Sequence, residues 1–202
     1  MTTTYEGNLS LRDALRRYFD DNGFGADGGY GSSWVELKVG PIPMPFPNTS
    51  ARKKAVPFHD LHHIATGYGT DWSGEAEISA WELGAGCKTM LVAWQLNLSM
   101  SFVGCFFAPR RTFAAFVSGR RSRSFYGQSY EPLLDLSVAQ ARTHTAIPAT
   151  QPRATPTDLA LFGATFVGGL GASLVSLALF MPLAPFGIAA GLLAKRRAVS
   201  PA

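Results

Sequence analysis

Apolar residues recur at helical spacing near the start of the chain. The run begins after Ser10, which forms with Asp13 a pair typical of a helix N-terminus, and it stops at Asn22-Gly23. The apolar positions between these signals are Leu11, Leu15, Tyr18 and Phe19. We therefore expect an amphipathic helix of about three turns. A flexible glycine-rich loop is expected over residues 25–31.

The pattern then changes from helical spacing to alternation. Apolar and polar residues alternate from Trp34 to Val39, which predicts a short strand or extended arm. Prolines follow at every second position, at Pro41, Pro43, Pro45 and Pro47. Such a run excludes a helix and predicts a stiff, extended segment. After this segment, the pattern suits two helices over about 56–67 and 74–83, joined by a loop.

An apolar stretch and a basic stretch in the middle of the chain suggest contact with a membrane. Residues 89–108 carry no charge, but their polar side chains favour a buried or membrane-surface helix over a membrane span. Five arginines follow within residues 110–123, with Phe113, Phe116 and Val117 between them. This arrangement predicts either a helix in the headgroup layer, with its apolar stripe toward lipid, or an ordinary solvated face.

The C-terminal part of the chain carries the strongest signal of any segment. Prolines and small polar residues over 146–157 predict a linker, and residues 159–194 contain no charged residue. Leu159–Phe180 is long enough for a transmembrane helix, and the apolar residues after it allow a hairpin. Basic residues at 195–197 then predict that this end lies on the cytoplasmic side.

The expected fold is mainly α: a helical bundle with a short extended arm and a C-terminal transmembrane helix or hairpin. We expect a helical metal-binding domain over 1–145, a proline-rich linker over 146–157 and an apolar membrane anchor over 158–197. Small residues such as Gly163, Gly168 and Gly171 leave one side of the anchor smooth. That face permits a homo-oligomer through close helix contact.

Composition narrows the setting of the protein. The 202 residues carry a formal net charge of +4, but the basic residues cluster beside apolar segments, so we expect no nucleic-acid partner. The two cysteines, Cys87 and Cys105, lie in apolar stretches and fit a reducing compartment. Residues 1–20 lack a signal-peptide core and contain acidic residues that a mitochondrial targeting helix avoids. The expected location is a membrane, with the protein facing the cytoplasm and contacting membrane lipid.

A histidine-rich stretch carries the candidate chemistry. In a helix, His59 and His63 lie about 40° apart around the axis, and Asp60 completes an arc of about 100°. Two imidazoles at i and i+4, completed by a carboxylate from a second element, are a usual way to hold zinc. The loop before Glu75 can bring that carboxylate back to the ion. We therefore predict one divalent metal held by His59, Asp60, His63 and Glu75, with zinc favoured and iron or manganese allowed.

The neighbouring polar residues have less direct predicted roles. His62 projects to the other edge of the arc and is a poorer ligand. Glu82 lies seven residues after Glu75 on the same helix face, as a reserve ligand or an outer partner of a ligand. Glu77 faces away and is expected to be solvated. Membrane di-iron enzymes and HD phosphohydrolases need more histidines than the four in this chain, so counting excludes both.

The motif His59-Asp60-x-x-His63, followed after eleven residues by Glu75, resembles the zinc motif of the ubiquinone (coenzyme Q) biosynthesis protein 4 family. The resemblance extends from about Ser10 to Arg123 and includes GPIPMPFPNT and TDWSGEAEI. It implies a mostly helical, membrane-associated protein that binds zinc and a prenyl lipid. It also implies a link to assembly of the quinone-making complex and to loss of the carboxyl group from the aromatic ring, with hydroxylation at the same carbon. The apolar tail departs from the family core and points to a bacterial branch with its own anchor in the inner membrane.

Two functions from different classes remain open. One is a metal-dependent lyase or oxidative decarboxylase acting on a prenylated quinone precursor, with the metal polarising a phenolic oxygen or carboxylate and His62 or Glu82 handling a proton. The other is a non-catalytic, zinc-stabilised lipid-binding scaffold that organises other quinone-biosynthesis proteins. A structural site is closed by four protein ligands, whereas a catalytic site keeps one position open. The spacing of the motif does not decide between them.

Overall fold

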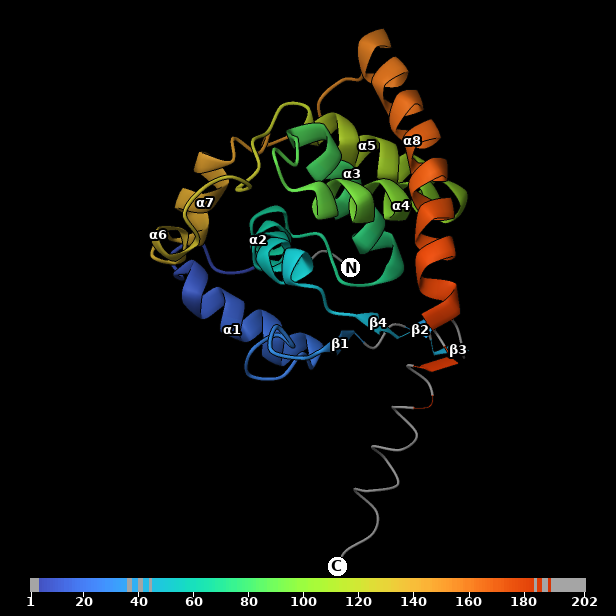
Figure 1. The fold of residues 1–202 in the computed structure, drawn as a ribbon. Coiled ribbons are helices and arrows are strands. Elements are labelled where there is room, and N and C mark those ends of the chain that lie inside the picture. The colour runs from blue at the N-terminus through green and yellow to red at the C-terminus, as the bar shows by residue number, and fades with distance from the viewer. Residues whose placement is uncertain are drawn as a thin grey trace, which may run out of the picture.

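The chain folds mainly into helices (Figure 1). The computed structural model describes residues 4–35, 38–39, 42–43, 45–183, 185–186 and 189. The helices are α1 (Leu11–Asn22), α2 (Ser50–Thr66), α3 (Trp72–Ala85), α4 (Leu91–Phe107), α5 (Pro109–Gly119), α6 (Tyr130–Leu134), α7 (Val138–His144), α8 (Pro156–Phe180) and the 3₁₀ turn η1 (Met181–Leu183). The strands are β1 (Trp34–Val35), β2 (Lys38–Val39), β3 (Ile42–Pro43) and β4 (Phe46–Pro47). The predicted mainly α fold is confirmed.

Helix α1 has the limits that the sequence predicts. The Ser10 hydroxyl accepts a hydrogen bond from the Asp13 N–H at 3.1 Å, and Gly23 ends the helix with φ 67°. The buried residues of α1 are Leu11, Ala14, Leu15, Tyr18 and Phe19. Ser10 also forms a β-bridge with Ser137, just before α7. The beginning of the chain is therefore joined to a segment that is distant in sequence.

The described residues of the proline-rich segment pair with the residues before them and do not form an unpaired extended segment. Trp34 is paired with Pro47, and Lys38 with Pro43, both antiparallel. The two pairs keep the same register. Proline lacks an N–H and is tolerated in such short edge strands. The predicted arm also includes residues 36–37, 40–41 and 44, which lie outside the described residues.

Helix α2 begins six residues earlier than the pattern predicts. It starts at Ser50, where the side chain of Thr49 accepts a hydrogen bond from the Arg52 N–H, and it contains Pro57 in its interior. Proline is favoured in the first turn of a helix and disfavoured in its interior. Here the helix continues through Pro57. In space, α2 lies between α1 and α7 on one side and α3 and α4 on the other (Figure 1).

Helices α3 and α5 pack with their backbones unusually close. A Cβ added at Gly84 would meet the backbone of Phe116, and one added at Gly119 would meet the backbone of Trp81. Trp81 is fully buried between these elements. These glycines allow α3 to lie deep in the molecule, where it contributes Glu75 and Glu82 to the site described below.

The arginine-rich helix α5 does not direct its apolar stripe toward the surface. Phe116 and Val117 are buried, and Phe113 and Phe116 pack against Phe162 of α8 at ring-centroid distances of 5.1 and 5.3 Å. The interpretation of this stripe as lipid-facing is therefore wrong. Sequence alone does not reveal that α3 and, at Phe162, α8 cover it.

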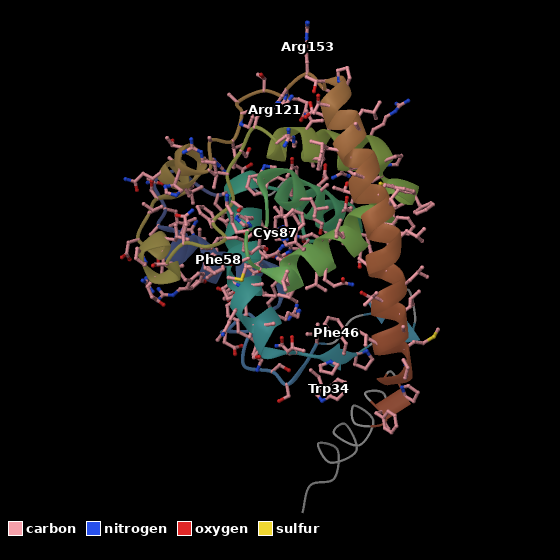
Figure 2. The ribbon with its side chains drawn as sticks, turned by 45° about the horizontal axis from the view of Figure 1, so that its top comes forward. Trp34, Phe46, Phe58, Cys87, Arg121 and Arg153 are labelled. Carbon is pink, nitrogen blue, oxygen red and sulfur yellow. The ribbon has the colours of Figure 1, made fainter. Side chains whose placement is uncertain are left out.

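Helix α8 is a candidate membrane span by length and composition, over Pro156–Leu179. It runs antiparallel along α4, and its first turn lies close to Arg121 (Figures 1 and 2). Residues 146–155 before it contain no helix or strand. The division into domain, linker and anchor stays a prediction, as does homo-oligomer formation. Most of the apolar residues after η1, and basic residues 195–197, lie outside the described part of the chain.

Candidate metal centre

Two helix ends bring three predicted ligands together. His59 and His63 lie one turn apart near the end of α2, which stops at Gly67 with φ 78°. Helix α3 begins after Asp71, whose side chain accepts a hydrogen bond from the Gly74 N–H at 2.7 Å. This cap places Glu75 in the first turn of α3, facing the two histidines.

The three side chains meet through their ligand atoms. The Nε2 atoms of His59 and His63 are 3.1 Å apart, and the two rings are nearly perpendicular, at 86°. The Glu75 carboxylate lies 3.4 Å from His59 Nε2 through Oε2 and 3.5 Å from His63 Nε2 through Oε1. Among the described residues, these three form a group that can hold a metal ion.

The hydrogen bonds of the other ring nitrogens determine which nitrogen faces the site. His59 Nδ1 lies 3.0 Å from Oε1 of Glu82, and His63 Nδ1 lies 3.0 Å from the carbonyl oxygen of Tyr68. A carboxylate and a carbonyl only accept, so each Nδ1 carries a hydrogen. In its neutral form, each imidazole presents an Nε2 lone pair to the other ring, beside a carboxylate. This arrangement is repulsive unless a cation lies between them.

The spacing fits a metal ion. Two imidazole nitrogens bound to one tetrahedral zinc ion, at ~2.0–2.1 Å each, lie about 3.3 Å apart. The observed separation between His59 Nε2 and His63 Nε2 is 3.1 Å. Nitrogen and carboxylate ligands also suit iron and manganese. The residues present thus fit a divalent metal without rearrangement of the backbone.

The local electrostatics favour a positive charge at this point. Burial alone would raise the pKa of Glu75. The charges of His63 and His59, and their hydrogen bonds to the carboxylate, have the larger effect and lower this pKa to about 2. Burial lowers the pKa of His59, but Glu82 and Glu75 outweigh it and hold that pKa well above its ordinary value. In the absence of a metal, protonated His59 therefore carries the positive charge at this position.

Glu82 is the centre of a buried network behind His59. Its Oε1 accepts from the Nδ1 atoms of His59 and His62, at 3.0 and 2.6 Å. Its Oε2 accepts from the side-chain amide of Asn97 and, at 2.7 Å, from the hydroxyl of Tyr126. Burial opposes ionisation of Glu82, but the two histidines hold its pKa well below the ordinary value. Glu82 is therefore a buried carboxylate that only accepts hydrogen bonds. Its hydrogen bond with Nδ1 orients the His59 ring.

His62 has no free ring nitrogen. Its Nε2 accepts from the N–H of Phe125 at 2.8 Å, and its Nδ1 donates to Glu82. The ring stacks on that of Phe125 with 3° between the planes, and the side chain is fully buried. Burial lowers the pKa of His62, so the ring is neutral. Proton transfer by His62 or Glu82 stays a prediction, and both side chains are fully buried.

Asp60 is not among the three residues that gather at the described site. Its carboxylate accepts a hydrogen bond from the Tyr30 hydroxyl, on the glycine-rich loop. Burial raises the pKa of Asp60. The role of Asp60 as a fourth ligand stays a prediction.

Glu77 is not solvated as expected. It is buried, and the Arg111 guanidinium donates to both of its oxygens, through Nε at 2.9 Å and through Nη2. The expectation failed because the partner, Arg111 of α5, lies 34 residues further along the chain than Glu77, and no local pattern links the two residues. Asn97, Tyr126 and the Tyr68 carbonyl were also missed, since nothing in their local sequence marks them as partners of a histidine site.

The site is open on one side. The side chains of His59 and Glu75 are 20 % and 34 % exposed, whereas that of His63 is 1 % exposed. The His59 and Glu75 side chains are therefore partly accessible to solvent. Comparison of the chain with protein-family models, with curated proteins and with solved structures finds no match.

Proposed function

We propose that the protein holds one divalent metal ion, preferably zinc, on His59, His63 and Glu75 and acts in prenylated quinone synthesis. The reaction that we propose is removal of the carboxyl group from the aromatic ring of a prenylated precursor. The metal assignment rests on one observation: the Nε2 atoms of two imidazoles lie 3.1 Å apart beside a carboxylate. The choice of substrate rests on the motif resemblance.

A metal held by these three ligands alone would keep an open coordination position, which favours catalysis over a closed structural site. Three protein ligands leave room for water or substrate, and the exposed edges of His59 and Glu75 provide the access. A bound divalent ion would act as a Lewis acid that withdraws charge from a phenolic oxygen or a carboxylate. When the carbon–carbon bond breaks, its electron pair stays on the ring carbon, carbon dioxide leaves, and a proton adds to that carbon.

The protein's own residues prepare the site for this chemistry. Glu82 and the Tyr68 carbonyl keep the hydrogens on the Nδ1 atoms of His59 and His63, so both Nε2 atoms face the metal position. The buried network around Glu82 holds His59 in one orientation. The apolar surface of α8 associates the protein with the membrane, where a prenylated precursor dissolves.

One observation favours the alternative of a zinc-stabilised lipid-binding scaffold. The polar network around Glu82 joins α2, α3, α4 and the segment at Tyr126, so it links much of the fold. In this second function, the metal fastens α2 to α3, and the protein organises other quinone-synthesis enzymes without reacting. Both functions require the metal, but only the first converts a substrate.

Metal analysis and an activity assay together test the proposal. We expect about one equivalent of zinc, iron or manganese in purified protein, and carbon dioxide release from a carboxyl-labelled prenylated hydroxybenzoate in vesicles. The assay is run with and without oxygen, since hydroxylation at the same carbon requires an oxidant. Glu75→Gln should lose metal and turnover, whereas the exposed control Glu131→Gln should keep both. Metal without turnover in either atmosphere would support the scaffold instead.

A further inference from the structure

Helix α8 has one packed side and one open side. The residues on the packed side repeat at spacings of four and three: Asp158, Phe162, Thr165, Gly169, Ala172 and Ser176. This spacing is typical of a helix that packs along a second helix. The remaining surface of α8 is apolar and exposed, for example at Val167, Leu170 and Leu174.

Specific contacts hold α8 against α4. The side-chain amide of Gln95 donates to the carbonyl of Ala172 at 2.7 Å and lies 3.0 Å from the hydroxyl of Ser176. A Cβ at Gly169 would lie 2.6 Å from the carbonyl oxygen of Leu98, so the two backbones are in close contact. Glycine at such a position permits helices to approach closely.

An ion pair fastens the first turn of α8 to the rest of the molecule. The Arg121 guanidinium donates to both carboxylate oxygens of Asp158, at 2.7 Å each, and Asp158 is 1 % exposed. Figure 2 shows Arg121 beside the beginning of α8. Contacts at this end and along α4 therefore keep α8 docked over most of its length.

A docked α8 cannot also cross a bilayer. Its 25 residues, about 37 Å long, match the hydrocarbon thickness of about 30 Å. The body of the protein lies alongside the same length (Figure 1). Crossing would place α3 and α5 at membrane depth, including the Glu77–Arg111 ion pair, in which the Arg111 side chain is 50 % exposed. Charges at that depth are strongly unfavourable.

The exposed apolar surface continues from α8 onto α4. Within the described part of the chain, all exposed large apolar side chains except Phe24 and Trp72 lie on α4, on α8 or directly after α8. At the end of α4, Phe106 is 70 % exposed. We call this combined surface of α4 and α8 the two-helix face. Exposed Arg110 and Arg153 lie near one end of it and form no ion pair with a described residue.

We infer that the two-helix face lies in the plane of an anionic phospholipid bilayer while α8 stays docked on α4. The apolar side chains of both helices enter one leaflet, and Arg110 and Arg153 contact anionic headgroups. The uncharged, apolar character of the open side of α8 favours lipid over a protein partner, whose interface would include a polar rim. This inference deepens one part of the proposed function, the association of α8 with the membrane. It does not depend on the proposed decarboxylation.

A reversible cross-link separates docked binding from insertion of α8 alone. The hydroxyl oxygens of Ser99 on α4 and Ser176 on α8 are 3.5 Å apart, so Ser99→Cys with Ser176→Cys should form a disulfide. We expect the oxidised protein to float with phosphatidylcholine–phosphatidylglycerol vesicles as well as the reduced protein, within about two-fold. A ten-fold or greater loss of flotation on oxidation would overturn the inference. The Ser99→Cys single variant controls for oxidation of the native cysteines.

A second variant tests the contribution of α4. Phe106→Asp places a charge on the α4 part of the two-helix face and also removes the ring contact with Phe166 of α8 at 6.2 Å. We expect vesicle binding to fall at least ten-fold. Trp72→Asp, at another exposed apolar side chain, should bind as the wild type does. Unchanged binding of Phe106→Asp would show that α8 alone enters lipid. Metal content reports separately on the site, so failure of this inference is distinguishable from failure of the proposed function.

Discussion

Glu82 and His62 share a 2.6 Å hydrogen bond between two fully buried side chains, because Nδ1 of His62 donates to Oε1 of Glu82. All the other recorded side-chain partners of Glu82 also donate to it: His59, Asn97 and Tyr126. Such a carboxylate has no isosteric replacement, since an amide carries two hydrogens of its own.

Replacement of this carboxylate should weaken both the fold and the site. In Glu82→Gln, either orientation of the amide directs its NH₂ group at donors, which leaves buried polar groups unpaired. We expect a loss of about 2–4 kcal/mol in the free energy of unfolding and a 10–100-fold loss in metal affinity. Urea denaturation and metal titration measure the two effects. Glu131→Gln is the control, and equal stability of the two variants would contradict the network.

Removal of either histidine ligand should abolish tight metal binding. His63→Ala removes one of the two Nε2 atoms that lie 3.1 Å apart, whereas His144→Ala removes an exposed ring bonded to Gln128. We expect only the first variant to lose its metal during dialysis. In the wild type, metal at one hundred times Kd should stabilise the fold by about 2.7 kcal/mol. Thermal unfolding with and without a chelator measures this difference.

The metal-free protein should lose stability in acid through Glu75. Its pKa is lowered from 4.5 to about 2 in the folded state, so the unfolded chain binds the proton more readily. The contribution of Glu75 is therefore present above pH 4.5 and is lost as the pH falls toward 2. Comparing the unfolding free energy of the wild type and Glu75→Gln from pH 5 to pH 3 isolates it. Parallel pH curves for the two proteins would argue against this coupling.

Two glycines of α8 should respond differently to the same substitution. Gly169→Ala adds a Cβ 2.6 Å from the Leu98 carbonyl oxygen, whereas a Cβ at Gly171 has nothing within 4 Å. We expect Gly169→Ala to lower the unfolding free energy by about 1–3 kcal/mol through overpacking. Gly171→Ala should be neutral or stabilising by up to about 1 kcal/mol, because alanine favours helix. Limited proteolysis would show whether α8 is released only in the first variant.

Local signals in the sequence were sufficient to predict an element whose limits are set by its own residues. The cap at Ser10 and the left-handed Gly23 defined α1. The start of α2 was missed because Pro57 resembles a helix beginning, although the helix tolerates it internally. Pairing of Trp34 with Pro47 was not predicted, because alternation indicates a strand without naming its partner.

The candidate site follows the same division. His59 and His63 were predictable from their helical spacing, and Glu75 from its place just after the loop. Tyr126 is 44 residues from Glu82 and Tyr30 is 30 residues from Asp60, and only the folded chain brings each pair together. Hydrogen bonds of this kind depend on packing between elements, which no local pattern encodes.

The bridge between Ser10 and Ser137 imposes an order on synthesis. The Leu11 N–H donates to the Leu136 carbonyl and the Val138 N–H to the Leu9 carbonyl, both at 2.8 Å, so α1 reaches its final position only after residue 138 has left the ribosome. Helix α8 starts at Pro156 and emerges later. At ~5–20 residues per second, that interval lasts roughly 1–4 s. The α1–α7 contact can therefore form before α8, the longest apolar helix of the described chain, leaves the ribosome.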